Sequence, residues 1–370
     1  TIICQNIIGM DIAQGNRRII AIASPNFPFK KWLSRSRMSF LRRAAQFINY
    51  PLGFSLELIK TLAQVHKENP VDLVEGGDFG AELFFLLLFK IESIKYIIKL
   101  HTPSFVIREF NQESKTLFYQ VLERLEEFCL KRADAVYSPS ETLLKIVTEK
   151  YHIPVKEVIP YPTFPMIKTK GIKRDQNMIL YVGKLQYKKG VYELVYAFSE
   201  VVARNPKAKM VFIGPDTLRY GHSTKKELRV ILRSKGVYSQ VTFISPIPQN
   251  KLGRYYLKAG MIVIPSHWEN FPNVLLEAGC YGTPVIATKV GGITEIINHG
   301  KTGLFIQPQS VKQIAQAIHT FIQNPALAKS VAIKFKLQIQ KTYSPKSIAE
   351  LTLGFYDGLL RLPTAELGDQ

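Results

Sequence analysis

Short apolar runs alternate with longer amphipathic stretches along the chain. In the first half, five segments rich in β-branched and aromatic residues end in polar, Gly or Pro turns and predict strands: RRIIAIAS (17–24), VDLVEGG (71–77), KYIIKLH (95–101), ADAVYSPS (133–140) and EVIPYP (157–162). Apolar residues recur at helical spacing in 113–131 and 141–150. Strands that alternate with helices are typical of a parallel α/β sheet.

The second half repeats this alternation after FPMIKTKGIKRDQN (164–177), a basic stretch without apolar period that we interpret as a linker. Further strands are predicted at MILYVGKL (178–185), KMVFIG (209–214), VTFISP (241–246) and MIVIPS (261–266). Helices are predicted at 191–202, 225–235, 250–259, 311–322 and 345–360. The chain therefore reads as two doubly wound, Rossmann-like parallel-sheet domains, 1–165 and 177–344, and a C-terminal helix with a tail, 345–370, that returns to the first domain.

The first fifteen residues fit this pattern less well. They are better described as an amphipathic helix that ends at Gly15 than as a strand. A doubly wound domain normally opens with a strand and a loop that leads into its first helix. We therefore expect that first strand and its loop to be absent from the chain.

Composition narrows the class of partner. A chain of 370 residues suits two domains, and its formal net charge of +20 favours anionic partners. Nucleic acid is not expected, because no helix-turn-helix, zinc-finger or RNA-binding signature occurs. The three cysteines, Cys4, Cys129 and Cys280, are far apart in the sequence, which argues against a disulfide scaffold and against a cysteine metal site. A chain without a disulfide scaffold suits the reducing cytoplasm. The longest apolar run, 83–89, is far shorter than the roughly 20 residues that cross a bilayer.

The segment SHWENFPNVLLEAGCYGTPVIATKVGGITEII (266–297) carries most of the candidate chemistry. Glu269 lies in a loop directly after a predicted buried strand, and Glu277 follows eight residues later in a helix that begins near Asn273. A helix N-terminus at the carboxyl end of a parallel strand favours phosphate. Carboxylates accept hydrogen bonds from paired hydroxyls. Two carboxylates around a phosphate site therefore suggest a nucleotide-sugar, with ribose on one side and a hexose on the other.

This Glu-x7-Glu block, followed by GKTGLFI (300–306), resembles the retaining glycosyltransferases of family four. YVGKLQYKKG (181–190) is similar to their phosphate-binding turn, and KLHTP (99–103) to their first-domain histidine loop. VDLVEGGDFGAE (71–82) also looks like their N-terminal domain. The resemblance implies the GT-B fold, in which two domains of the predicted kind face a cleft.

The resemblance also implies roles for individual residues. Glu269 would contact the transferred sugar and His101 its anomeric region, so these two are the expected catalytic residues. Glu277 would bind the donor ribose. The remaining expected donor-binding residues are Gly183, Lys184, Lys189, Ile247, Asn270, Phe271, Pro272, Asn273 and Val274. Two departures from the family stand out: Lys184 replaces its usual Arg, and its glycine-rich N-terminal loop is not found.

The implied activity is transfer of a hexose from a nucleoside-diphosphate sugar to a hydroxyl of a glycan or lipid-linked acceptor, with retention at the anomeric carbon. No metal and no cofactor are expected, since the lysines and the helix dipole can offset the charge of the diphosphate. The leaving phosphate would help to deprotonate the acceptor. Two alternatives stay open: a nucleotide-sugar epimerase on the same fold, and a non-catalytic nucleotide-sugar-binding relative.

A basic stretch, FKKWLSRSRMSFLRRAAQF (29–47), contains Trp32 and Phe40 among its cations. Such a segment can bind an anionic membrane surface, and the simpler alternative is a solvated loop. The expected location is therefore cytoplasmic, with a peripheral position on the inner face of the membrane as one form of it. The expected site residues also have simpler alternatives. Lys184 and Lys189 would then be solvated surface lysines, and His101 would have a purely structural role.

Overall fold

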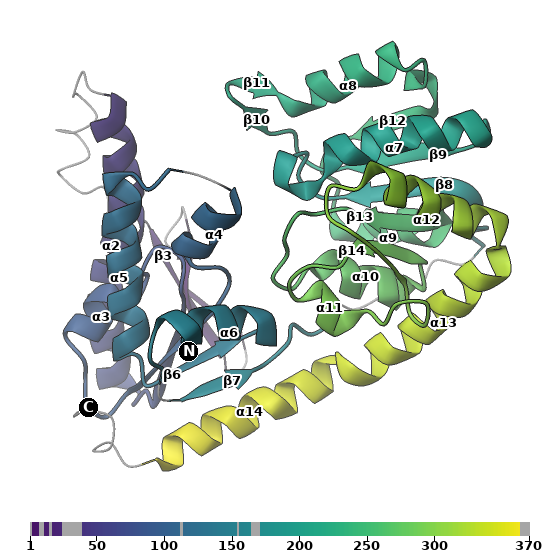
Figure 1. Ribbon diagram of the computed structural model, residues 1–370. Coiled ribbons are helices and arrows are strands. Elements are labelled where there is room, and N and C mark those ends of the chain that lie inside the picture. Colours follow the sequence, from purple (N-terminus) through teal and green to yellow (C-terminus); the bar gives the residue numbers. More distant parts are fainter. Residues whose placement is uncertain are drawn as a thin grey trace. The chain divides into compact units, whose positions relative to one another are not determined.

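The computed structural model describes residues 2–6, 11–14, 17–23, 39–111, 114–153, 155–163 and 171–362 (Figure 1). The chain forms two compact units. The first comprises Thr1–Pro139, Leu143–Val158 and Leu353–Gln370, and the second comprises Ser140–Thr142 and Ile159–Thr352. Each unit contains a parallel sheet with helices, so the predicted α/β class is confirmed.

The main sheet of the first unit has four parallel strands in the order β4-β5-β6-β7. Their bounds are β4 Leu73–Gly77, β5 Lys95–Lys99, β6 Ala135–Ser138 and β7 Lys156–Val158. All of β6 and all but the last residue of β5 are buried, as expected for apolar runs that pack on both faces of a parallel sheet. These strands lie within or close to the segments that the apolar pattern predicted.

The helices of the first unit agree less closely with the sequence pattern. They are α2 Ser39–Glu68, α3 Phe84–Leu88, α4 Ser104–Asn111, α5 Leu117–Arg132 and α6 Glu141–Lys150. The helix predicted at 113–131 corresponds to α5, which begins at Leu117. The Thr116 hydroxyl accepts a hydrogen bond from the Tyr119 amide and so caps the first turn. The 30-residue α2 was not predicted.

The helix expected over the first fifteen residues is wrong. Residues Ile2–Asn6 form β1 and Asp11–Gln14 form β2, and both pair with β3, Arg17–Ala23, in a second, three-stranded sheet. β1 runs parallel and β2 antiparallel to β3. The β-branched isoleucines of this segment favour extended backbone, and pairing with β3 outweighs the weak helical spacing. The inference that a first strand is absent depended on this helix and loses its basis.

The second unit is built on a six-stranded parallel sheet with the order β12-β9-β8-β13-β14-β15. The strands are β8 Asp175–Val182, β9 Lys209–Ile213, β12 Val241–Ile244, β13 Ala259–Ile264, β14 Val285–Thr288 and β15 Leu304–Ile306. A short hairpin of β10, Leu218–Arg219, and β11, His222–Ser223, lies outside the sheet. The chain adds β9 and β12 on one side of β8 and then returns to add β13 on the other, so the strand order reverses between β8 and β13.

Helices cover both faces of this sheet, as Figure 1 shows. A buried apolar cluster joins one face to α7 Val191–Arg204, α8 Thr224–Ser234 and α12 Val311–Gln323. A second group packs together: α9 Gln249–Lys258, α10 Asn273–Tyr281 and α13 Pro325–Thr342. Two shorter features are η1 Tyr187–Lys189 and α11 Ile293–Ile296, and α14 Pro345–Arg361 ends the described chain. The sequence pattern missed α13.

Within the described residues, no helix has the length and apolar character that crossing a bilayer requires. The basic stretch 29–47 lies largely outside the described residues, because only the backbone of 39–47, at the start of α2, is described. The membrane-surface prediction therefore stays a prediction.

Candidate functional site

A cavity of about 350 Å³ opens in the second unit at the carboxyl ends of β8 and β13. Val182 at the end of β8 and Gly183 directly after it line the cavity, as do Val263 and Ile264 of β13. Because the strand order reverses between these two strands, their following loops diverge and leave a crevice. This is where open α/β sheets bind their ligands.

Lysines supply one wall of this cavity. Lys184, Lys188 and Lys189 lie in the turn between β8 and α7, and all three line the cavity. Opposite in the same lining, Pro272, Asn273 and Val274 form the start of α10. The helix begins at Asn273 as predicted, Pro272 occupies the cap position, and no side chain caps the helix. The amides of the first turn therefore point at the cavity, and with the lysines they favour an anionic group.

Glu269 also lines the cavity and contacts one of its lysines. Its Oε1 lies 2.5 Å from the Lys189 ammonium and accepts a hydrogen bond from the Ser266 hydroxyl at 2.7 Å. The Glu269 side chain is 13% exposed and that of Lys189 27% exposed, so the pair is only partly screened by water. Lys189 is thus placed to exchange one anion, the Glu269 carboxylate, for another that enters the cavity.

Two glycines hold the backbone around Glu269 in place. The Gly292 amide donates to the Glu269 carbonyl at 3.1 Å. A Cβ at Gly291 would lie 2.0 Å from that carbonyl oxygen, and a Cβ at Gly292 would lie 1.8 Å from the Asn270 carbonyl oxygen. Only residues without a side chain allow this approach. The Gly-Gly that follows β14 therefore has a packing function at the loop that carries Glu269.

Glu277 lies one turn into α10 but does not line the cavity. Its carboxylate accepts hydrogen bonds from the Tyr256 hydroxyl at 2.5 Å and from the Gln249 amide at 2.8 Å. Burial raises the pKa of Glu277 above the ordinary value for Glu, and these two hydrogen bonds oppose the increase. The result is a carboxylate held in a fixed orientation by two groups on α9.

Besides Glu277, three predicted donor residues lie away from the cavity lining. Ile247 follows β12 and is half-buried. Asn270 is buried, and its Oδ1 accepts a hydrogen bond from the Ser140 hydroxyl at 2.6 Å. Phe271 is buried with its ring edge-on to Tyr161 and Tyr343. The side chains of Asn270 and Phe271 thus anchor the loop, and any contact of theirs with a ligand would have to come from the backbone.

His101 belongs to the first unit, where it follows β5. Its amide donates to the Asp78 carboxyl at 2.8 Å. Burial raises the pKa of Asp78 to about 8, which keeps this fully buried carboxyl neutral at neutral pH. Partial burial of the imidazole, together with nearby Lys99, lowers the pKa of His101. The loop therefore carries a neutral imidazole on a backbone fixed by a buried acid.

Several residues around the cavity were not foreseen from the sequence. His267 donates its amide to the Lys188 carbonyl at 2.8 Å, and its Nε2 lies 3.0 Å from Oε1 of Glu193. These contacts tie the loop after β13 to the lysine turn. Ser266, which binds Glu269, and Tyr256, which binds Glu277, were missed too. Within the part of the chain that the structure describes, no cluster of three or more His, Cys, Asp or Glu residues could hold a metal ion.

Comparison with protein families matches almost the whole chain. The family described as "Glycosyl transferases group 1" matches residues 164–336, and the one described as "Glycosyltransferase Family 4" matches residues 17–162. The boundary between the two matches falls close to the boundary at residue 159 between the two units.

Curated relatives agree with this result over part of their length. The chain is 32% identical over 186 residues to an uncharacterized glycosyltransferase of Methanocaldococcus jannaschii, which covers 50% of the chain and 46% of the relative. It is 35% identical over 154 residues to a D-inositol 3-phosphate glycosyltransferase of Acidothermus cellulolyticus, covering 40% of the chain and 34% of the relative. The chain thus spans less than half the length of either relative.

Solved structures share the fold at low sequence identity. Sucrose-phosphate synthase of Thermosynechococcus elongatus superposes with a TM-score of 0.71 at 20% identity, over 94% of this chain and 85% of that one. Anabaena HepE, solved with UDP and glucose, gives a TM-score of 0.68 at 17% identity, over 96% and 99% of the two chains. Together with the two parallel sheets, these matches confirm the predicted GT-B fold class.

Proposed function

We propose that this chain, which matches the group 1 glycosyltransferases over residues 164–336 and the family 4 glycosyltransferases over residues 17–162, is a glycosyltransferase. It would transfer a hexose from a nucleoside-diphosphate sugar to a hydroxyl group with retention at the anomeric carbon. The observation that carries the proposal is the cavity at the point where the strand order reverses. Three lysines and an uncapped helix start surround it, and the Glu269 carboxylate pairs with Lys189 inside it.

The charges divide the cavity into two functional parts. Lys184, Lys188 and Lys189, together with the start of α10, suit the diphosphate, whose negative charge increases as it leaves. The Glu269 carboxylate, displaced from Lys189 by the diphosphate, would accept hydrogen bonds from hydroxyls of the transferred sugar. Glu277, held by Tyr256 and Gln249, would accept the ribose hydroxyls. Anabaena HepE was solved with UDP and glucose, which supports a donor of this class without identifying the base or sugar.

The reaction that we propose needs no protein nucleophile. The acceptor oxygen forms a bond to the anomeric carbon on the face from which the diphosphate leaves, and the bond between that carbon and the phosphate oxygen breaks. The acceptor proton passes to the departing phosphate oxygen. Lysines 184 and 189 stabilise the negative charge on the diphosphate as the bond breaks. His101, a neutral imidazole, is the proposed first-domain contact to the sugar.

The direct test is an assay with labelled UDP-, GDP- and ADP-hexoses and a panel of glycan and lipid-linked acceptors, with and without EDTA. We expect a glycoside product that keeps the donor's anomeric configuration by NMR and a rate that EDTA does not change. An epimerised donor without a glycoside would instead identify an epimerase. Saturable nucleotide binding without any turnover would identify a non-catalytic relative. Loss of transfer with EDTA that Mn²⁺ restores would contradict the metal-independent mechanism.

Glu277 predicts a pH dependence of donor binding. Its ionised form accepts hydrogen bonds from hydroxyls more strongly than its protonated form. Its raised pKa means that it becomes protonated at a higher pH than an ordinary Glu. Affinity for the nucleotide-sugar should therefore fall as pH decreases through a range above the usual Glu value. The Glu277→Gln variant should bind roughly tenfold or more weakly at neutral pH.

Calorimetric titration with a nucleotide-sugar between pH 5 and 8 measures both the pH dependence of binding and the effect of Glu277→Gln. A nucleotide-sugar is used since its diphosphate diester does not titrate in this range. The difference in affinity between the natural chain and the variant should shrink toward low pH. A difference that stays constant with pH would remove Glu277 from the ribose site.

We also propose a cytoplasmic location. The described cysteines, Cys129 and Cys280, are buried and unpaired, which suits a reducing compartment.

A further inference from the structure

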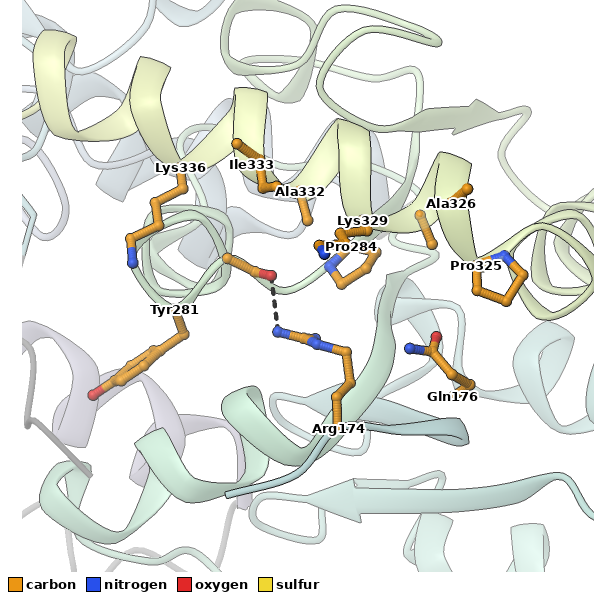
Figure 2. A pocket seen from close by; sticks show the side chains of 12 residues that line it. Arg174, Gln176, Tyr281, Pro284, Pro325, Ala326, Lys329, Ala332, Ile333 and Lys336 are labelled. Atoms are coloured by element: carbon orange, nitrogen blue, oxygen red, sulfur yellow. Dashed lines mark hydrogen bonds between the residues drawn. The ribbon is translucent and has the colours of Figure 1, made fainter. Parts of the chain in front are cut away.

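A second cavity, of about 580 Å³, lies at the other edge of the same sheet (Figure 2). Arg174 and Gln176 line it at the amino end of β8, and Pro284 lines it just before β14 begins. The remaining lining comes from Tyr281 and Gly282 at the end of α10 and from residues 325–336 of α13. Because the strands are parallel, their amino ends share one edge, and the cavity with Lys189 and Glu269 lies at the opposite edge.

The charge of this second cavity is of one sign. Arg174, Lys329 and Lys336 line it, and no Asp or Glu is among its lining residues. Neither lysine forms an ion pair with any residue in the described part of the chain. Lys336 is half-buried, and Lys329 is exposed. A set of cations without carboxylates favours an anion that is supplied from solution.

Arg174 is the most constrained of these cations. Its guanidinium donates to the Gly282 carbonyl at 2.9 Å, the bond drawn in Figure 2, and to the Ala259 carbonyl. These two bonds fix its plane and leave further N–H groups for a ligand, since a guanidinium has five donors. Burial lowers the pKa of Arg174, and no neighbouring carboxylate counters this effect. A bound anion would offset the cost of holding this charge away from water.

The backbone adds to the positive potential, and the side chains add an apolar wall. Pro325 and Ala326, the first residues of the 18-residue α13, belong to the lining, so the positive end of this helix dipole adjoins the cavity. Pro284, Ala332 and Ile333 contribute apolar surface beside Arg174 (Figure 2). The volume lies within the range of about 300–1,000 Å³ that is typical of small-molecule sites. It is much larger than an inorganic phosphate needs.

We propose that this cavity binds a phosphomonoester of a small organic molecule. Arg174, Lys329 and Lys336 would hold the phosphate, because a guanidinium pairs with phosphate through parallel hydrogen bonds and the lysines add charge. The organic part would pack against Pro284, Ala332 and Ile333. The site is separate from the one proposed for the sugar donor and does not depend on it.

The test uses phenyl phosphate, which combines a phosphomonoester with an apolar ring, and calorimetric titration of the whole chain. We expect saturable binding that the double variant Lys329→Gln/Lys336→Gln weakens by roughly tenfold or more. The matched control is Lys334→Gln/Lys341→Gln. It removes the same charge from the same helix at two exposed positions that do not line the cavity, and its affinity should equal that of the natural chain. Lys329→Gln alone, at an exposed position, should weaken binding in the same direction even if the double variant folds poorly.

Cross-controls separate this site from the donor site. Lys189→Ala should leave phenyl phosphate binding unchanged, and Lys329→Gln/Lys336→Gln should leave nucleoside-diphosphate binding unchanged. The proposal is overturned if phenyl phosphate does not saturate, if both double variants lose affinity equally, or if Lys189→Ala abolishes binding. Equal loss would mean that the net charge of +20 attracts the anion without a site.

A parallel arm identifies the source of the phosphomonoester. Vesicles of phosphatidylcholine with and without phosphatidic acid, whose headgroup is a phosphomonoester, are sedimented with the natural chain and both double variants. Binding to phosphatidic acid that phenyl phosphate displaces, and that only Lys329→Gln/Lys336→Gln loses, would show that a lipid headgroup reaches the site. Binding of phenyl phosphate alone would show that the ligand is a soluble metabolite.

Discussion

The Glu269→Gln variant is expected to lose transfer activity by roughly 10²–10³-fold, the usual effect of removing one group that stabilises a transition state. Its affinity for a nucleoside diphosphate should be equal to or greater than that of the natural chain. The reason is the ion pair of 2.5 Å between Glu269 and Lys189, which competes with the diphosphate for the same ammonium. A neutral amide at 269 ends this competition while it keeps the size of the side chain. Transfer rates and calorimetric affinities measured on the same preparation check the expected loss of activity and the expected nucleotide affinity.

Lys189→Ala is the companion variant, and the two should behave in opposite ways. The opposite effect concerns nucleotide affinity: removing Lys189 should weaken nucleoside-diphosphate binding by roughly tenfold or more. Transfer should fall in both variants. A Glu269→Gln variant that retains most of the transfer rate would contradict the sugar contact proposed for Glu269. One that binds nucleoside diphosphate much more weakly would contradict the competition between carboxylate and diphosphate.

Gly190→Ala should destabilise the second unit by about 2–5 kcal/mol, the sum of a strained backbone and a close steric overlap. Gly190 has φ of +69° where η1 ends and α7 begins. A Cβ there would lie 2.0 Å from the carbonyl oxygen of Pro265, in the loop after β13. Backbone cannot yield as a flexible side chain does, so the lysine turn and the Glu269 loop would have to separate. Urea unfolding followed by circular dichroism measures the loss.

Gly221→Ala is the matched control for that experiment. Gly221 also has positive φ, +84°, but a Cβ there would meet nothing within 4 Å. The Gly221→Ala variant should therefore lower the free energy of unfolding only through backbone strain, by about 1 kcal/mol. Equal destabilisation by the two variants would mean that the contact with Pro265 does not determine the stability of Gly190→Ala.

Much of the candidate site could be predicted because it is local in sequence. A strand, a loop and a helix follow one another from 259 to 281. Glu269 lies in the loop and Glu277 near the start of the helix, so their spacing places both near the carboxyl end of the strand. Apolar runs bounded by Gly, Pro and polar residues predicted β4 to β7 of the first unit and β8, β9, β12 and β13 of the second, since burial of a parallel strand needs continuous apolar residues. Strands β1 and β2 were missed because their isoleucines fit both periods in so short a segment.

The contacts that give these residues their chemistry were decided by tertiary structure. Lys189 and Glu269 are 80 residues apart, and Tyr256 and Glu277 are 21 apart, so no local spacing relates either pair. The fit of Gly190 against Pro265, and of Arg174 against Gly282 at a separation of 108 residues, depends on which strands are neighbours in the sheet. By itself, the sequence determined the α/β alternation, the basic charge and the two carboxylates at the end of a strand. Strand order then decided which cation meets which carboxylate and which cations meet none, because charges interact through distance in space and not through distance along the chain.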